Sequence, residues 1–592
     1  MKKKCLFGLS LIALLSLAGC TSTSKSGTED IGGDYSYNDP ITVEDPEDID
    51  IEENTGEFSI TTSDGAYTNS GNIYRLTKGG TYSLSGKLSG QILVEAGEDD
   101  EVVLELKNAS IDYDQDSPIK ILSADKVEIS AKSDTGNTIT DKRNAKTTDV
   151  LDQGEGAIYA KSDLKFKGTG ILVVTGNYNN GVHTTKNLTI QKLTLKVVGN
   201  NNALKGNDGV TITSGTVQAY AKTGNGIKTE NTDVSSKGNQ RGTVAINGGY
   251  VYVDSLHDAI DASYNVEINQ LDSEVSTEIS IKTGTNSTYY SKTTFKADSE
   301  KGVKAQNDII VNDGTMVIAA SDDAVHANYG IALDNGSKGT GNITITGGAI
   351  QVASGDDGLH ADNTLTISGG RVVVTGATEG FEGNYINISG GSSYIYGTDD
   401  GVNCSKKSFK TCAFTMSGGY LDVAVKSGDT DGIDSNGDVT ISGGVIVSRG
   451  SPGTTQSHMS TGLDVDGTCS MTGGTLIAFN GLEKTPSKSS SILYAGTSNA
   501  NSSSGGGPGG GGGGPGGGGG HWSYNASTTY TFQNGKYRLV GTNIDISFTN
   551  DYTYGSFQIH SASLSTGATY ELFRNDEQVL SWSQTSSSVT IS

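Results

Sequence analysis

Carboxylates recur in two columns of a five-residue phrase that this 592-residue chain repeats eleven times between Asn180 and Val465. Each phrase has a polar or acidic leading residue, a small residue, a hydrophobe, a residue expected to point outward, and a final small residue. DAVHA from Asp323 and DGLHA from Asp357 are examples. The carboxylates of these columns and their neighbours, which we predict to be metal ligands, are Asp258, Asp261, Asp322, Asp323, Asp356, Asp357, Glu379, Glu382, Asp399, Asp400, Asp431 and Asp434.

Stacking would bring these carboxylates close together. Short repeats bury their hydrophobic faces only against one another, which places equivalent residues about 4.8 Å apart. Two carboxylates at that distance repel by about 0.9 kcal/mol in water and by about 3.5 kcal/mol at an effective dielectric constant near 20. Bound Ca²⁺, which takes oxygen ligands, would turn the repulsion into attraction, so we expect Ca²⁺ as the cofactor. The alternative is a purely polar ladder, because Asn180, Asn202 and Asn225 lead three of the phrases.

Histidine and lysine share the outward column with the carboxylates. His326 and His360 occupy equivalent positions in consecutive phrases, and zinc favours compact clusters that contain histidine. We nevertheless expect these histidines to be solvated or to face sugar. Lys304, between Asp261 and His326 in the column, is the best candidate for the base of a calcium-dependent lyase. A salt bridge to a neighbouring carboxylate is the simpler interpretation of this lysine, so we predict no catalytic residue.

Short strands follow the phrases and set their spacing. Seven segments alternate apolar and polar residues and end in Gly-Gly, where glycine permits the positive φ of a sharp turn. Successive first glycines from Gly347 to Gly473 are separated by 22, 21, 28, 25 and 30 residues. Such steps fit coils of two or three strands, so we predict an all-β chain wound as a parallel β-helix. Its buried ladder should contain Val303, Val325, Leu359, Phe381, Val402, Ile433 and Leu463.

The N-terminus resembles an export signal. A basic start precedes an apolar run over residues 6–17, which is too short to span a bilayer. The sequence LAGC at residues 17–20 resembles a bacterial lipobox, which implies cleavage before Cys20 and lipid attachment to its thiol. We therefore predict an extracytoplasmic protein, lipid-anchored to the bacterial cell membrane and exposed at the cell surface.

Composition divides the chain into five segments. We predict a lipoprotein signal peptide over residues 1–20, a disordered acidic tether over 21–54, the β-helix over 55–500, a Gly-rich linker over 501–524 and a C-terminal β segment over 525–592.

Charge and cysteine content exclude two classes of protein. The formal net charge of −25 excludes a nucleic-acid partner, because the phosphate backbone repels a surface of its own sign. Five cysteines in 592 residues exclude a disulfide-dense scaffold. Cys404 and Cys412 lie eight residues apart, and their pairing stays open.

The segment from Gly65 to Asp141, with GGTYSLSGKLSGQILVEAGEDDEVVLELKNASI, resembles the first coils of a bacterial family of carbohydrate-binding, calcium-binding β-helix surface proteins. Coils of the type DGLHADNTLTISGG, the stretch GGGPGGGG and the terminal SASLSTGATYELFRND are similar to the rest of that family. The resemblance extends from Thr55 to the C-terminus. It implies a right-handed, pectate-lyase-like β-helix that binds Ca²⁺ and cellulose or acidic, pectin-like polysaccharide, and it implies no enzymatic activity.

These observations predict a monomeric cell-surface lipoprotein that binds polysaccharide along one flank of a calcium-stabilised β-helix without catalysing a reaction. Two alternatives stay open: a calcium-dependent enzyme similar to pectate lyase, and a structural surface adhesin. Some aromatic side chains could either stack on sugar rings or pack between coils; they are Tyr250, Tyr252, Tyr394, Tyr396 and Tyr420.

Overall fold

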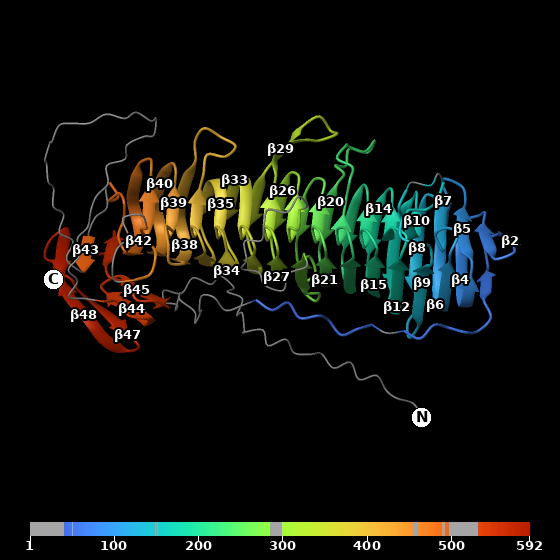
Figure 1. Ribbon diagram of the computed structural model, residues 1–592, viewed down its shortest axis with the longest axis horizontal. Helices are drawn as coiled ribbons and strands as arrows, with labels where there is room; N and C mark the ends of the chain where they lie inside the picture. The colour runs from blue at the N-terminus through green and yellow to red at the C-terminus, as the bar shows by residue number, and fades with distance from the viewer. Residues whose placement is uncertain are drawn as a thin grey trace, which may run out of the picture.

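Stacked parallel strands make up most of the computed structural model, which describes residues 41–49, 51–148, 150, 152–284, 299–453, 460–487, 492–495 and 531–591. All regular elements within these ranges are β-strands, and they form one elongated stack with a smaller β unit at its C-terminal end (Figure 1). The predicted all-β class is confirmed. Along most of the stack a strand pairs in parallel with the strand three places later, so successive coils build three ladders.

The first ladder carries the repeated phrases. Each hydrophobe from Val303 to Leu463 pairs with the hydrophobe of the next coil, and all of them are buried, as the sequence predicts. Outward residues therefore stack on outward residues, and His326 lies beside His360. The strands of this ladder are β5 (Gln91–Glu95), β7 (Ile119–Ser123), β10 (Gly156–Ala160), β13 (Asn180–Thr184), β16 (Leu204–Gly206), β19 (Ile227–Lys228), β22 (Ile260–Ala262), β25 (Val303–Ala305), β28 (Val325–Ala327), β33 (Leu359–Ile367), β35 (Phe381–Ile388), β37 (Val402–Cys404), β39 (Ile433–Ser435) and β41 (Leu463–Val465).

The second ladder contains the strands that end in Gly-Gly. The second glycine of each pair has a positive φ, from 72° at Gly391 to 94° at Gly249, as predicted. The first glycine is required for a different reason, because a Cβ on Gly390 would lie 2.3 Å from the carbonyl oxygen of Ser368 on the preceding coil. Besides parts of β33 and β35, this ladder contains β4 (Gly80–Ser89), β6 (Glu101–Tyr113), β8 (Lys126–Ala131), β11 (Asp163–Gly168), β14 (Asn187–Ile190), β17 (Gly209–Ile212), β20 (Thr243–Ile246), β23 (Val266–Ile268), β26 (Asp308–Val311), β31 (Asn342–Ile345), β38 (Ala413–Val425), β40 (Asp438–Arg449) and β42 (Cys469–Phe479).

The third ladder forms the side of the stack along which residues 41–49 run. Ile41 and Val43 are buried against Tyr252 of this ladder, whose hydroxyl donates a 2.6 Å hydrogen bond to Asp45. This part of the segment expected to be a tether thus lies against the coils (Figure 1). Besides the later halves of β38, β40 and β42, the ladder contains β9 (Gly136–Asp141), β12 (Ile171–Gly176), β15 (Thr194–Gly199), β18 (Thr216–Ala221), β21 (Gly249–Ser255), β24 (Thr277–Thr283), β27 (Thr315–Ala320), β32 (Ala349–Ser354), β34 (Arg371–Ala377) and β36 (Ser392–Gly397).

Antiparallel pairing closes both ends of the stack. At the first end β1 (Ser59–Thr62) pairs with β4, and β2 (Tyr67–Ser70) pairs with β3 (Ile73–Leu76). At the other end β46 (Phe557–Ser561) pairs antiparallel with β42 and β43 (Ile492–Ala495). Such caps cover the edge strands, which would otherwise offer unpaired backbone groups to another chain.

The C-terminal residues form the predicted β extension. Its four-stranded antiparallel sheet has the order β45-β44-β47-β48 and shares a hydrophobic core with side chains of the stack such as Tyr420 and Ile477. The buried Arg449 of β40 joins this unit to the stack, because its guanidinium bonds Asp422 and donates to Asn550 Oδ1 at 2.7 Å. The remaining strands are β44 (Gly535–Gly541), β45 (Ile544–Asn550), β47 (Thr569–Arg574), β48 (Glu577–Ser583) and β49 (Ser588–Ile591).

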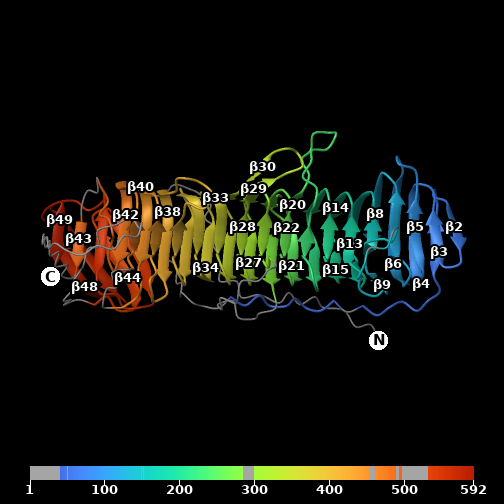
Figure 2. The same ribbon diagram turned by 45° about the horizontal axis from the view of Figure 1, so that its top comes forward.

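A hairpin interrupts the regular coils on the flank of the first ladder. Its strands β29 (Tyr329–Ala332) and β30 (Lys338–Thr340) pair antiparallel, directly after β28, and project from the stack (Figure 2). The hairpin therefore places its aromatic residue, Tyr329, beside the outward column.

Several predicted features lie outside the described residues: the signal peptide over residues 1–20 with Cys20, and the Gly-rich linker over 501–524. Within the described ranges no helix is long and apolar enough to cross a membrane. Cys404 and Cys412 are free thiols, and the Cys412 thiol donates to the Cys404 carbonyl at 3.2 Å, which answers the question of their pairing.

Truncation of the buried ladder tests this register. Leu359→Ala should lower the free energy of unfolding by about 2–5 kcal/mol, because it opens a cavity between tightly stacked coils. Leu271, with 74% of its surface exposed, supplies the control: Leu271→Ala should change that free energy by about 0.5 kcal/mol or less. Equal losses in the two variants, measured by chemical denaturation, would contradict the register.

Candidate functional site

The leading residue of most phrases binds the backbone of the next coil. Oδ1 of Asp323 accepts a hydrogen bond from the N–H of Asp357 at 3.0 Å, and Oδ1 of Asp357 accepts one from the N–H of Glu379 at 3.2 Å. One oxygen of each such carboxylate therefore accepts a backbone hydrogen bond, and the other can contact a cation. The same side-chain-to-backbone bond is made by Asn180, Asn202, Asp258, Asp400 and Asp431.

Lysine supplies that cation at several of the predicted metal ligands. Lys301 Nζ lies 2.9 Å from Asp322 Oδ2 and 2.6 Å from Asp323 Oδ2. Lys304 Nζ lies 2.9 Å from Asp258 Oδ2 and 4.0 Å from Asp261, and Lys228 Nζ lies 2.7 Å from Asp261 Oδ2. Burial lowers the pKa of Lys304, but the Asp258 and Asp261 carboxylates outweigh burial, so that pKa is raised above its usual value. A lysine held in its charged form is a poor general base. The geometry therefore favours the salt-bridge interpretation of Lys304 and does not favour its use as a lyase base.

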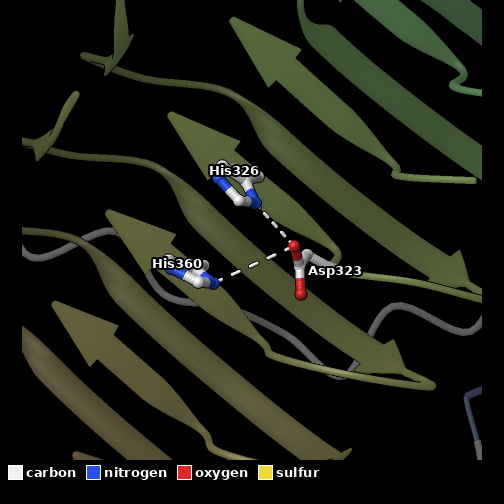
Figure 3. A group of neighbouring side chains, drawn as sticks. All are labelled: Asp323, His326 and His360. Carbon is white, nitrogen blue, oxygen red and sulfur yellow. Dashed lines mark hydrogen bonds and ion pairs between the residues drawn. The ribbon is translucent and has the colours of Figure 1, made fainter. Parts of the chain in front are cut away.

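On the next two coils, stacked histidine rings occupy the outward position that Lys304 occupies on the coil before them. The rings of His326 and His360 lie 4.3 Å apart at 21°, and both residues are buried. Nδ1 of His326 lies 2.6 Å from Asp323 Oδ2, and Nδ1 of His360 lies 3.9 Å from the same oxygen (Figure 3). On the other side of the rings, both Nε2 atoms face Asp362 Oδ1, at 3.5 Å and 3.3 Å. The sequence-based expectation of solvated or sugar-facing histidines is wrong for this pair, because carboxylates enclose both rings.

Further carboxylates complete this group. Nδ1 of His360 lies 2.8 Å from Asp357 Oδ2 and 3.2 Å from Glu382 Oε2, and Lys407 binds the other oxygen of Glu382. Three-residue sets whose ligand atoms all lie within 4.8 Å of one another connect these coils. We call the group the acid–histidine cluster; it contains Asp322, Asp323, His326, Asp356, Asp357, His360, Asp362, Glu379 and Glu382.

Burial and crowding shift the pKa values within the acid–histidine cluster in opposite directions. Burial raises the pKa of Asp323, but the hydrogen bond from His326 and the charge of Lys301 outweigh it and hold that pKa well below its usual range. Burial and the neighbouring Glu379 raise the pKa of Asp357 well above its usual range. Burial lowers the pKa of His360, yet the surrounding carboxylates, Asp362 foremost, raise it overall. The surrounding carboxylates thus favour the protonated form of His360.

A second group of carboxylates lies further along the same column without such partners. Within the described part of the chain, Asp400, Asp431, Asp434 and Asp464 have no ion pair with a basic side chain. Burial and mutual repulsion raise the pKa of Asp400 to about 8, that of Asp431 to about 7, that of Asp434 to about 6 and that of Asp464 to about 8. We call these four residues the C-terminal acidic cluster.

The predicted metal ligands therefore fall into three groups. Asp258 and Asp261 are bound by lysines. The six predicted ligands that the structure brings together with the two histidines are Asp322, Asp323, Asp356, Asp357, Glu379 and Glu382. Asp399, Asp400, Asp431 and Asp434 are not part of any compact three-ligand set of the described residues. Asp362 was missed by the sequence reasoning, although it follows the phrase DGLHA directly.

The aromatic residues that the sequence offered for sugar stacking are not available for it. Tyr252, Tyr394, Tyr396 and Tyr420 are buried, and Tyr250 is partly buried beside residues 41–49. These rings pack between the coils and the segments that cover them.

A different aromatic group lies beside the acid–histidine cluster. The ring of Tyr329 lies 4.7 Å from that of Phe409, which lies 6.2 Å from that of Tyr385. Tyr329 is 40% exposed, and its backbone N–H donates to Asp362 Oδ2 at 2.8 Å. The same carboxylate thus joins this aromatic group to the histidine pair.

A family model described as carbohydrate-binding domain-containing protein matches residues 70–358 and 338–506. A carbohydrate-binding domain-containing protein of Acetivibrio thermocellus is 33% identical over 196 residues, which are 32% of this chain and 62% of that relative. The chain thus spans less than two thirds of the length of this relative. A solved polysaccharide lyase-like protein from C. thermocellum, a gadolinium derivative, is 34% identical, with a TM-score of 0.34 over 37% of this chain and 84% of that one.

The C-terminal acidic cluster predicts an inverse dependence of stability on pH. Because the pKa of Asp400 is about 8 in the folded chain and near 4 in an unfolded one, the folded state holds extra protons between these values. The stabilisation that these extra protons give the folded state is fully present below about pH 4 and is lost as the pH rises toward 8. In chelator at pH 8, Asp400→Asn should therefore raise the free energy of unfolding by at least about 1 kcal/mol, while at pH 4 it should change little.

Asp438→Asn is the matched control for this measurement. Asp438 also accepts a hydrogen bond from the next coil, from the N–H of Thr468 at 2.7 Å, but it is exposed and that bond lowers its pKa. Its replacement should bring no gain in stability at pH 8. A gain of the same size in both variants, measured by denaturation at the two pH values, would refute the assignment of repulsion to Asp400.

Proposed function

The chain belongs to the carbohydrate-binding domain-containing protein family, and from this premise we propose that it is an extracytoplasmic, non-catalytic protein that binds polysaccharide on the flank of its first ladder. The observation that carries the proposal is the aromatic and basic surface formed by Tyr329, Tyr385 and the loop over residues 405–411. Cellulose and acidic, pectin-like glycan are the proposed ligands.

The aromatic part of this surface suits a sugar ring. The rings of Tyr329 and Phe409 pack 4.7 Å apart, tilted at 49°, and Tyr385 is held beside them by a 2.7 Å hydrogen bond to Thr411. Tyr329 is exposed, and Phe409 and Tyr385 are partly exposed. Pre-positioned aromatic rings supply large contact area at little cost in conformational entropy. They offer the apolar face that the C–H bonds of a pyranose ring require, whether or not the sugar is charged.

The basic part of the surface suits a uronate. The loop that carries Phe409 also presents Lys406, Lys407 and Lys410, which are exposed. Lys407 is bound to Glu382, whereas Lys406 and Lys410 have no ion pair with a described carboxylate. In a chain with a formal net charge of −25, such a patch gives an anionic polysaccharide one place to approach without repulsion.

Calcium is the proposed cofactor of the acidic stretch. The C-terminal acidic cluster fits it, because several carboxylates whose pKa values are raised by burial and by repulsion lie on neighbouring coils without a basic partner among the described residues. Oxygen ligands of this kind are those that Ca²⁺ takes. Asp400, Asp431, Asp434 and Asp464 would hold the ion, which would neutralise the column and let the coils stack at neutral pH.

The remaining parts of the proposal follow from the sequence. We place the protein on the cell surface as a monomer, anchored through lipid on Cys20, and we assign the stacked coils the right-handed winding of a pectate-lyase-like β-helix. The parallel ladders support that architecture. The ion pairs of Lys304 speak against a lyase, and a surface adhesin that binds protein remains the outcome if no glycan is bound.

Two variants distinguish the contribution of ring stacking to glycan affinity from the contribution of charge. Phe409→Ala should weaken binding to both cellulose fragments and polygalacturonate on the order of 10-fold, because it removes the central ring of the surface. The double variant Lys406→Ala, Lys410→Ala should weaken only polygalacturonate binding and should flatten its salt dependence. Tyr67, which is 39% exposed at the far end of the stack, gives the control Tyr67→Ala, which should bind both glycans normally. Unchanged affinities in the Phe409 and lysine variants, measured by affinity electrophoresis, would refute the surface.

Melting curves with and without Ca²⁺ test the proposed cofactor, and a product assay distinguishes a binding protein from a lyase. The midpoint of thermal unfolding should rise with millimolar Ca²⁺ because only the folded chain binds the ion, and Asp400→Asn with Asp431→Asn should reduce that rise. Incubation with polygalacturonate and Ca²⁺ should yield no unsaturated product that absorbs ultraviolet light. A calcium-dependent product that disappears in Lys304→Ala would replace the binding proposal by the lyase, and a melting curve indifferent to EDTA would remove calcium from it.

A further inference from the structure

We propose that His326 and His360 form the nitrogen ligands of a site for one borderline transition-metal dication of the Zn²⁺ class, distinct from the proposed Ca²⁺ sites. Asp323 Oδ2 supplies a third ligand, and Asp357 Oδ2 or Glu382 Oε2 supplies the fourth. These atoms come from three successive coils, so the ion would tie those coils together. The inference is independent of glycan binding.

The first argument comes from the carboxylates that lie at both nitrogens of each imidazole ring. Each ring has a carboxylate at both nitrogens: Asp323 or Asp357 at Nδ1, and Asp362 at both Nε2 atoms. A neutral imidazole donates from only one nitrogen, and the lone pair on the other would then face a carboxylate oxygen. Protonation of both rings would remove that conflict but would place two positive charges in rings 4.3 Å apart. A metal ion between the Nδ1 atoms and the carboxylates resolves the conflict with both rings neutral.

Asp362 lies where a carboxylate that orients metal-bound histidines would lie. Metal-bound histidines generally donate their other ring N–H to a carboxylate, which fixes the tautomer and raises the basicity of the ligand nitrogen. Asp362 Oδ1 lies 3.3 Å from Nε2 of His360 and 3.5 Å from Nε2 of His326, which has no hydrogen bond among the described residues, and Asp362 Oδ2 is fixed by the backbone N–H of Tyr329. Both Nδ1 atoms are thereby directed toward Asp323, as Figure 3 shows.

Two buried polar atoms that lack hydrogen bonds among the described residues lie beside the proposed ion. Glu382 is only 1% exposed, and its Oε2 has no hydrogen bond within the described part of the chain, although it lies 3.2 Å from Nδ1 of His360. Nδ1 of His360 likewise lacks a hydrogen bond there. Buried polar atoms without partners are rare in folded proteins and require an explanation, such as an ion.

The donor set decides the class of ion. Imidazole nitrogen together with carboxylate oxygen suits Zn²⁺ and its neighbours in the first transition row, whereas Ca²⁺ takes oxygen ligands alone. The ligand atoms of Asp323, His326 and His360 lie within 4.8 Å of one another, and so do those of Asp357, His360 and Glu382. Four carboxylates face the two rings, and two lysines balance two of these charges. Lys301 Nζ lies 2.6 Å from Asp323 Oδ2, so the ion would share that oxygen with the lysine, and Lys407 binds Glu382 Oε1. The uncompensated charge matches a dication.

The test uses the full chain, stripped of metal by chelator and then returned to buffer with excess Ca²⁺. Titration with Zn²⁺ should give one equivalent bound despite the Ca²⁺, and Co²⁺ should give the visible absorption bands of a site with nitrogen ligands. The double variant His326→Gln, His360→Gln should lose at least about 100-fold in Zn²⁺ affinity. Asp362→Asn should lose about 10- to 100-fold, as removal of a second-shell partner does.

His183 provides the matched control. It lies in the same outward column and is buried, but it bonds Asn207 and packs on Tyr159 instead of facing a carboxylate. His183→Gln should leave the Zn²⁺ stoichiometry and the Co²⁺ spectrum unchanged. Absence of Zn²⁺ binding by the wild-type chain, loss of bound Zn²⁺ to Ca²⁺, or equal binding by the wild type and the double variant would overturn the proposal. If the double variant does not fold, the Co²⁺ spectrum of the wild type and of Asp362→Asn decides.

Discussion

The structure depends on one bond that most coils make to the next: a side-chain oxygen of the leading residue accepts the backbone N–H of the leading residue that follows it. This bond, made by asparagine at Asn180 and by aspartate at Asp323, fixes where one coil sits on another. Since a slip of one residue along a strand would turn every hydrophobe outward, the bond also fixes which residues are buried. The hydrophobic ladder and the outward column are two consequences of the same register.

That register could be predicted from the sequence, because it depends on local patterns. Alternation along the strands marks the inward residues, and the Gly-Gly pairs mark the turns: Gly391 has a positive φ, and a Cβ on Gly390 would collide with the preceding coil. The ladder from Val303 to Leu463 follows from these two signals. Neither signal needs any knowledge of residues far away in the chain.

The chemistry of the flank could be predicted only in part, because it depends on residues outside the repeat. His326 and His360 were placed in one column, but their enclosure depends on Asp362, which comes from the turn after the phrase. Phe409 lies in a loop whose length differs from coil to coil, so no spacing rule could set it against Tyr329. Tyr252 and Tyr420 alternate like exposed residues, yet residues 41–49 and the C-terminal unit cover them. Each difference comes from a segment that the repeat pattern does not contain.

Where this leading bond is made it requires a polar side-chain oxygen, and the chain meets the resulting charge in three ways along its axis. At Asn180 and Asn202 the oxygen belongs to a neutral amide, which needs no counter-charge. At Asp258, Asp323 and Asp357 it belongs to a carboxylate whose second oxygen lies beside lysine or histidine. From Asp400 onward the carboxylates remain, but no basic side chain of the described residues meets them. Because asparagine would serve the backbone equally well there, the carboxylates are not explained by the fold. Burial makes such a charge costly and the backbone bond does not need it, which is the physical ground for the proposal that a cation from the surroundings balances it.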